Sequence, residues 1–83
     1  MEEKTKLLWT KAIEDAKSLV SEHFIEFMSK VKLSSFEDNT LTVEVPSQSY
    51  VETIENTYID GLAPALRNVF GEDIKLMYSY QIL

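Results

Sequence analysis

The chain has 83 residues, of which 45% are apolar, and a formal charge of −6. This length predicts one domain spanning residues 1–83, and the apolar content argues against a disordered chain. The absence of cysteine excludes disulfides, thiolate metal sites and thiol nucleophiles. The charged N-terminus and the lack of a long apolar run argue against a signal peptide and a membrane-spanning helix, so we expect a cytoplasmic protein.

Negative charge dominates the middle of the chain, because no lysine or arginine lies between Lys32 and Arg67. Such a surface repels phosphate backbones and argues against strong binding of duplex DNA. The charge either keeps the chain in solution or forms a face for a basic partner, and both interpretations stay open. The acidic residues of this span are Glu37, Asp38, Glu44, Glu52, Glu55 and Asp60.

Residues 4–20 predict an amphipathic helix, because apolar side chains recur at three- and four-residue spacing. Glu2 and Glu3 lie at its start, where the helix dipole favours acidic groups. Trp9 is either a core residue or a partly exposed anchor for a partner, since tryptophan is frequent in interface hot spots. Leu7, on the opposite side, favours the second interpretation. The apolar arc consists of Leu8, Trp9, Ala12, Ile13, Ala16, Leu19 and Val20.

A second, shorter helix is expected from Ser21, a suitable N-cap, to about Lys30. His23 and Glu26 are three residues apart, but two ligands without a third make a poor metal site. Apolar residues fall on more than one face of this helix, so one face is expected in the core and another is free for a second protein. They are Phe24, Ile25, Phe27 and Met28.

Two short strands follow. Residues 31–36 predict the first, with Val31, Leu33 and Phe36 inward, and the polar residues 37–39 supply a turn. Residues 41–45 alternate apolar and polar side chains, which is typical of a strand buried on one face. Pro46 ends this strand because it lacks the backbone N–H of the ladder.

A broken third helix and a last strand complete the chain. Either Ser47 or Ser49 can cap the helix. Gly61 and Pro64 interrupt its apolar periodicity, so we expect a break near residues 60–62, with Pro64 in the first turn of the second half and Gly71 as its C-terminal cap. Residues 74–82 then alternate as a strand. The fold class is therefore a small two-layer α+β domain, with helices on one face of a three-stranded sheet.

No residue pattern indicates catalysis. The chain has one histidine, no phosphate-binding glycine loop and no metal-ligand set. We therefore expect a protein that is not an enzyme, with no catalytic residues, no metal and no cofactor.

Four features together resemble the N-terminal domain (domain I) of the bacterial chromosomal replication initiator family, DnaA. They are the Leu8-Trp9 pair, the segment EDNTLTVEVPSQ, the helix at 54–58 and the ending that runs from Gly71 through 74–76. The resemblance implies a KH-like fold of order ααββαβ. It further implies that the domain joins initiators to one another, helps to recruit the replicative helicase DnaB and receives lineage-specific regulators, without hydrolysing ATP.

The resemblance also implies which residues bind partners. Leu8 and Trp9 match the self-association position. The face for the helicase and regulators comprises Glu22, Phe24, Glu26, Ser49 and Tyr50. This chain departs from the family there: Phe24 replaces an acidic residue, Met28 replaces a tryptophan, and Ser49 and Thr53 replace aromatic residues. The partner face has therefore changed more than the core.

Two other functions remain open. A KH-like module could bind single-stranded nucleic acid weakly through its lysines, although the GxxG loop of KH domains is missing. The chain could also be a stand-alone regulator that imitates the initiator domain. The resemblance leads us to expect either an excised domain or a free-standing paralogue, since a linker, an ATPase domain and a DNA-binding domain follow in the family.

Overall fold

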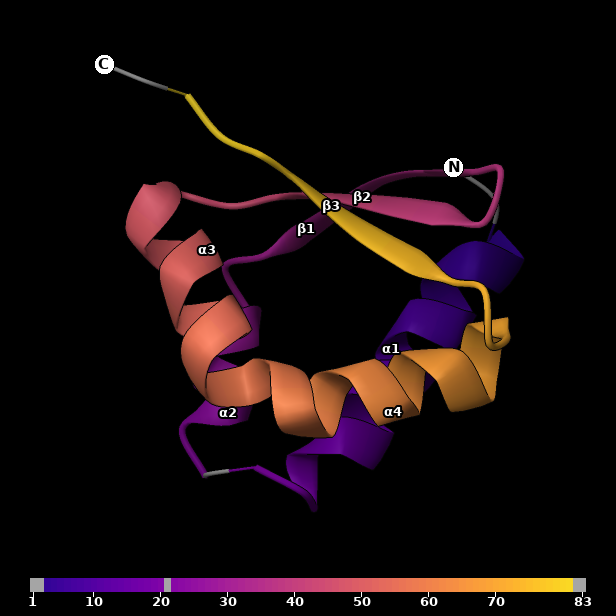
Figure 1. The fold of residues 1–83 in the computed structure, drawn as a ribbon, viewed down its shortest axis with the longest axis horizontal. Coiled ribbons are helices and arrows are strands. Elements are labelled where there is room, and N and C mark those ends of the chain that lie inside the picture. Colours follow the sequence, from indigo (N-terminus) through magenta and orange to yellow (C-terminus); the bar gives the residue numbers. More distant parts are fainter. Residues whose placement is uncertain (1–2, 21, 82–83) are drawn as a thin grey trace.

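The computed structural model describes residues 3–20 and 22–81. Helices cover one face of a three-stranded sheet (Figure 1), which confirms the predicted α+β class and element order. The predictions for Glu2, Ser21 and Ile82 lie outside the described residues. The elements are α1 (Glu3–Lys17), α2 (Phe24–Met28), β1 (Lys32–Glu37), β2 (Thr40–Glu44), α3 (Gln48–Thr53), the π-helical turn η1 (Ile54–Tyr58), α4 (Ile59–Phe70) and β3 (Lys75–Ser79).

Strands β1 and β2 form an antiparallel hairpin whose turn is the predicted polar cluster. Glu37 pairs with Thr40, so Asp38 and Asn39 alone make the connection. Their φ angles are 51° and 59°. A two-residue hairpin turn of type I′ has positive φ at both positions, and Asp and Asn tolerate that conformation better than most residues.

Strand β2 is central, with β1 and β3 at the two edges of the sheet. β3 pairs with β2 in parallel, from Thr40 opposite Lys75 to Glu44 opposite Ser79. A parallel neighbour needs a crossover connection, and the helices between β2 and β3 supply it. Because successive strand residues point to opposite faces, β2 turns Leu41 and Val43 toward the helices.

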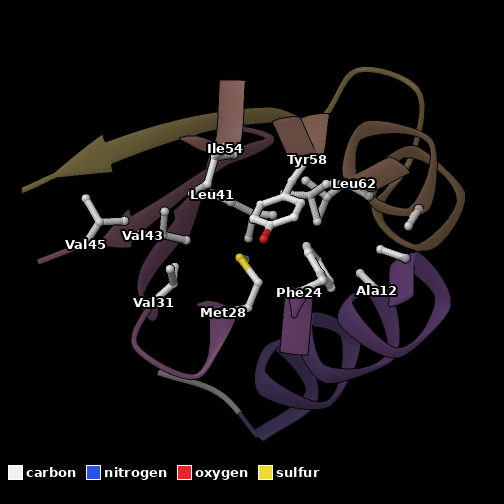
Figure 2. Close-up of a cluster of buried hydrophobic side chains, with 13 residues drawn as sticks. Ala12, Phe24, Met28, Val31, Leu41, Val43, Val45, Ile54, Tyr58 and Leu62 are labelled. Carbon is white, nitrogen blue, oxygen red and sulfur yellow. The ribbon is translucent and has the colours of Figure 1, made fainter. Parts of the chain in front are cut away.

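The core lies between the sheet and the helices, and residues from five elements (α1, α2, β2, η1 and α4) meet there together with Val31 and Val45 from the loops. Figure 2 shows Phe24 and Met28 from α2 directed toward the side chains of Leu41, Ile54 and Tyr58. None of the core residues has more than 7% of its surface exposed. The cluster comprises Ala12, Ala16, Phe24, Met28, Val31, Leu41, Val43, Val45, Ile54, Tyr58, Leu62, Ala65 and Leu66.

Helix α1 ends at Lys17, three residues before the predicted end at Val20. The Ser18 hydroxyl donates to the Asp15 carbonyl at 3.1 Å, and the Leu19 N–H donates to the Ala16 carbonyl at 2.9 Å. These short-range bonds tighten the chain into a turn in place of another helical turn. As a result Leu19 lies 62% exposed rather than in the apolar arc.

The third helix changes direction earlier than predicted. Its axis turns between α3 and α4 (Figure 1), at the π-helical residues Ile54–Tyr58, and Pro64 lies inside α4 rather than in its first turn. A π turn holds an extra residue, which displaces the helix axis without ending the hydrogen-bonded chain. The predicted break at residues 60–62 is therefore wrong in position, although the helix is interrupted.

The segment from α3 to α4 has a capping residue at each end. Ser47 is the N-cap of α3, and its hydroxyl contacts the Ser49 hydroxyl at 2.8 Å. Gly71 is the C-cap of α4, as predicted, with φ of 116° and an N–H that donates to the Arg67 carbonyl at 2.9 Å. Glycine fits there because side chains disfavour positive φ.

Candidate partner-binding surface

The first turns of α1 place three apolar side chains in three different environments. Leu7 is 67% exposed, Leu8 is half-buried beside β1, and Trp9 is half-buried against the core. Successive helical residues point about 100° apart, so the three cannot share one face. Trp9 thus packs against the core and is still partly exposed, so both sequence interpretations of it stay open.

An open hollow of about 600 Å³ lies beside Leu8. It is formed where the start of α1 approaches β1 and the end of α4. Lys4 and Glu37 give its walls both signs of charge, and Phe36 and Phe70, whose rings are 5.3 Å apart at 62°, form an apolar part of the wall. Its lining is Lys4, Thr5, Leu8, Ser34, Ser35, Phe36, Glu37, Val69 and Phe70.

A chain of aromatic rings connects α3 to the core through α2. Tyr50 stacks on Phe27 with centroids 4.3 Å apart, and Phe27 lies 5.0 Å from Tyr58. Tyr58 in turn meets Phe24 edge-on at 5.2 Å. Aromatic pairs at these distances and angles are favourable beyond their area burial. The rings therefore fix α2 against α3 and bring two of the sequence-predicted surface segments together.

Helix α2 divides its residues between the core and the surface. Phe24 is 0% exposed, so its side chain cannot contact a partner while the domain is folded. Its assignment to the partner face is therefore wrong, because the α2 register turns it inward with Met28. Ile25 is 39% exposed and is the apolar residue of α2 that lies at the surface.

The other residues predicted for this face are at the surface. Glu22, Glu26 and Ser49 are exposed, while Tyr50 is half-buried by its stack on Phe27. The sequence did not single out Ile25 or Phe27 as surface contributors. The apolar excess of α2 was the available signal, but only the packing shows which residue faces outward.

Tyr78 and Glu55 form a polar contact between β3 and η1. The Tyr78 hydroxyl donates to the Glu55 carboxylate at 2.6 Å. Burial of Tyr78, together with this hydrogen bond and the negative charge of Glu55, raises the pKa of the phenol above its usual 10.0. The contact ties the last strand to the middle of the third helix, and sequence alone gave no signal for it because the residues lie 23 apart.

Metal-binding geometry does not arise in the described part of the chain. No group of three or more His, Asp or Glu residues there is close enough to hold a metal ion. His23 is exposed and forms the N-cap position of α2 without a side-chain capping bond. Within residues 3–20 and 22–81 no helix is both long and apolar enough to cross a membrane.

The sequence is similar to bacterial replication initiators. It is 32% identical over 77 residues to the chromosomal replication initiator protein DnaA of Bacteroides thetaiotaomicron, which covers 92% of this chain and 16% of that protein. It is 38% identical over 74 residues to DnaA of Bacteroides fragilis, and this match covers 87% of this chain and 15% of that protein. The chain is a relative of DnaA. A third match, to DnaA of Chlorobaculum tepidum, has 50% identity over 48 residues, 58% of this chain and 10% of that protein.

The resemblance to DnaA that the sequence motifs indicated is therefore confirmed. The chain spans 16% or less of the length of each of these DnaA proteins. No protein-family model matches it. Because 92% of the chain aligns with a DnaA protein, the similarity extends over nearly all of the α+β fold rather than over one motif.

Proposed function

We propose that this chain is a protein-interaction domain that acts in the initiation of chromosomal replication, in the cytoplasm, as part of a DnaA initiator. The observation that carries the proposal is the similarity to DnaA over 92% of the chain. The proposal includes no catalytic step.

Self-association is assigned to the start of α1. Leu7, Leu8 and Trp9 present apolar surface in three directions, and Trp9 keeps part of its ring outside the core. A tryptophan anchored on one side and accessible on the other loses little side-chain entropy on binding. The contact is small, so it becomes effective when several initiators are held together on one DNA molecule.

Recruitment of the replicative helicase DnaB and of regulators is assigned to α2 and the start of α3. Ile25 supplies an exposed apolar centre, and Glu22 and Glu26 supply negative charge next to it. Tyr50 extends this surface onto α3 through its stack on Phe27. A partner with a basic rim around an apolar centre fits this arrangement.

Sedimentation of the wild-type chain over a concentration series tests the self-association proposal. We expect a weight-average mass that rises with concentration, and a smaller rise for Trp9→Ala. Because Trp9 also packs against the core, Leu7→Ser provides a second variant on an exposed residue. A wild-type chain that stays monomeric at the highest concentration would refute self-association and leave the helicase proposal standing.

Binding to immobilised replicative helicase tests the second surface. Glu26→Lys is expected to reduce binding, since it reverses the charge beside Ile25. Glu72→Lys, which changes charge equally on an exposed turn after α4, is the matched control. Equal binding by both variants would exclude α2 as the contact.

Single-stranded nucleic acid binding receives less support. Two of the lysines that would carry it are paired with carboxylates on the same helix: Lys11 with Asp15 at 3.4 Å, and Lys17 with Glu14 at 3.3 Å. Pairing lowers the positive potential that a phosphate backbone needs. The protein-binding proposal is therefore preferred.

A further inference from the structure

Helix α3 is attached to the domain through side chains that are only partly buried. None of its six described residues, Gln48–Thr53, is buried, whereas α1, α2, η1 and α4 each contribute buried residues. Tyr50 and Val51 are half-buried and pack against the core. A helix of six residues is too short to be stable alone in water, so α3 persists only while these contacts hold it.

The chain is fixed on both sides of this helix. Before it, Val45 is buried, and its N–H donates to a carbonyl of β3 at 2.9 Å. After it, Ile54 is buried, and the Glu55 carboxylate accepts the Tyr78 hydroxyl at 2.6 Å. Residues 46–53 therefore form a short segment between two anchors, one on the sheet and one in the core.

The two joints of this segment are not regular helix. Ser47 begins α3 with an extended backbone, and its side chain makes no capping bond to the described N–H groups of the helix. At the other end, the α-helix changes into the π turn η1 directly after Thr53. Such turns bend helix axes and are frequent at functional sites. The change from partly buried to fully buried side chains thus coincides with a change in helix type, which is a suitable place for a hinge.

One aromatic stack closes the segment onto α2. The rings of Tyr50 and Phe27 lie 4.3 Å apart at 23°. Phe27 has further support of its own, because it also lies 5.0 Å from Tyr58 and because the buried Phe24 and Met28 anchor α2 in the core. The stack therefore joins a weakly held segment to a firmly held one.

We propose that residues 46–53 open and close as one local unit between the two anchors, with the Tyr50–Phe27 stack as the latch. Opening unwinds α3 and separates Tyr50 from α2, while the core and the sheet stay intact. The closed state keeps Tyr50 beside the α2 surface of Ile25 and is the state that binds a partner there; this half rests on the function proposed for that surface. The open fraction lowers the apparent affinity for the partner, so any change that strengthens the latch raises it.

Hydrogen exchange of single amides, followed by NMR, tests the opening. The Ile54 N–H donates to the carbonyls of Tyr50 and Val51, so it becomes accessible when α3 unwinds. Leu66, buried in α4, is the reference. We expect Ile54 to exchange faster than Leu66, at a rate that low urea concentrations leave unchanged, whereas Leu66 exchange accelerates with urea because it requires global unfolding. Equal rates with equal urea dependence would show that α3 opens only with the whole domain and would overturn the proposal.

Substitutions in the same experiment test the latch. Tyr50→Ala should make Ile54 exchange about three- to tenfold faster, since it removes one aromatic stack. Tyr50→Phe keeps the ring and should exchange as wild type does. Glu52→Ala, at an exposed position of the same helix, is the matched control and should change the rate by less than about twofold. If Tyr50→Ala has no larger effect than Glu52→Ala, the stack is not the latch.

Exchange in the presence of the replicative helicase tests which state binds. If only the closed state binds, Ile54 exchange should slow about tenfold when free helicase is at roughly ten times its dissociation constant. Glu26→Lys, which reverses a charge of the proposed surface, should show less slowing at the same helicase concentration. Unchanged Ile54 exchange in the bound wild-type chain would show that open and closed states bind equally. A wild-type chain that does not bind would refute the helicase assignment and this half with it, while exchange in the free chain still decides the opening.

Discussion

The centre of this domain and the surface of its helical side, represented by Leu7, Ile25 and α3, differ in how deeply their side chains are buried. At the centre, Phe24, Leu41 and Leu62 are each 0% exposed and come from two helices and a strand. At the surface, Leu7 and Ile25 are 67% and 39% exposed, and α3 has no buried residue. Substitution at the surface removes few contacts, so partner surfaces can diverge while the centre keeps the fold. Four substitutions test this difference.

Phe24→Ala is expected to have the largest effect. It removes a fully buried ring that meets Tyr58 edge-on, and such truncations cost about 3–5 kcal/mol of unfolding free energy. Urea unfolding followed by circular dichroism measures the loss. Ile25→Ala, at the neighbouring position on the same helix, is the control and should cost less than about 1 kcal/mol. Equal costs for the two variants would contradict the division of α2 between core and surface.

Gly61→Ala is expected to cost about 1–3 kcal/mol. Position 61 is where α4 approaches the residues after α1, and an added Cβ would overlap Val20 Cγ1 and lie 3.2 Å from Leu19 Cβ. Thermal unfolding measures the change. Val20→Ala in the same chain removes the overlapping methyl groups and should recover part of the loss. If the effects of the two substitutions simply add, the close approach between position 61 and Val20 is contradicted.

Tyr78→Phe is expected to cost about 1 kcal/mol or less, because it removes one hydrogen bond in a half-exposed setting. Tyr80→Phe is the control, because it removes the hydroxyl of a tyrosine that directly follows β3 and is not the one bonded to Glu55. The smaller effect of the control would locate the stabilisation in the Tyr78–Glu55 contact.

The same contact predicts a pH dependence. The pKa of Tyr78 is raised in the folded state, whereas an unfolded tyrosine keeps about 10.0. Below the pKa of the unfolded tyrosine, Tyr78 is protonated in both states and its contact with Glu55 stabilises the fold fully. Above that pKa, Tyr78 loses its proton in the unfolded state first, so the free energy of unfolding falls as pH rises. Melting temperatures measured between pH 8 and pH 11 (roughly one unit or more on each side of the usual tyrosine value) should fall more steeply for wild type than for Tyr78→Phe.

Leu7→Ser is expected to have the smallest effect on folding, within about 0.5 kcal/mol, because the side chain is mostly in water already. Its melting temperature should match that of wild type while its sedimentation changes. A large loss of stability would place Leu7 in the core and remove it from the proposed contact.

Local sequence was sufficient wherever neighbouring residues determine the conformation. The turn at Asp38-Asn39 followed from residues that tolerate positive φ, and β2 followed from strict alternation. One of the motifs that resemble DnaA, the segment EDNTLTVEVPSQ, contains this turn and β2. The sequence also indicated two candidate partner-binding surfaces, one at the start of α1 and the other on α2.

Positions that depend on contacts between distant residues could not be predicted in the same way. Phe24 and Ile25 are adjacent and both apolar, and only the packing of α2 against Tyr58 decides which one enters the core. The early end of α1 depends on turn hydrogen bonds that helical periodicity does not reveal.

The sequence by itself determined the α+β class, the order of its elements and the relation to DnaA, because these follow from local periodicity and shared motifs. Tertiary structure alone decided the π-helical turn at Ile54–Tyr58, the Tyr78–Glu55 bond and the exposed β3 edge. The reason is physical: each of these depends on which segments meet across the core, and contacts between distant residues leave no periodic signal in the chain.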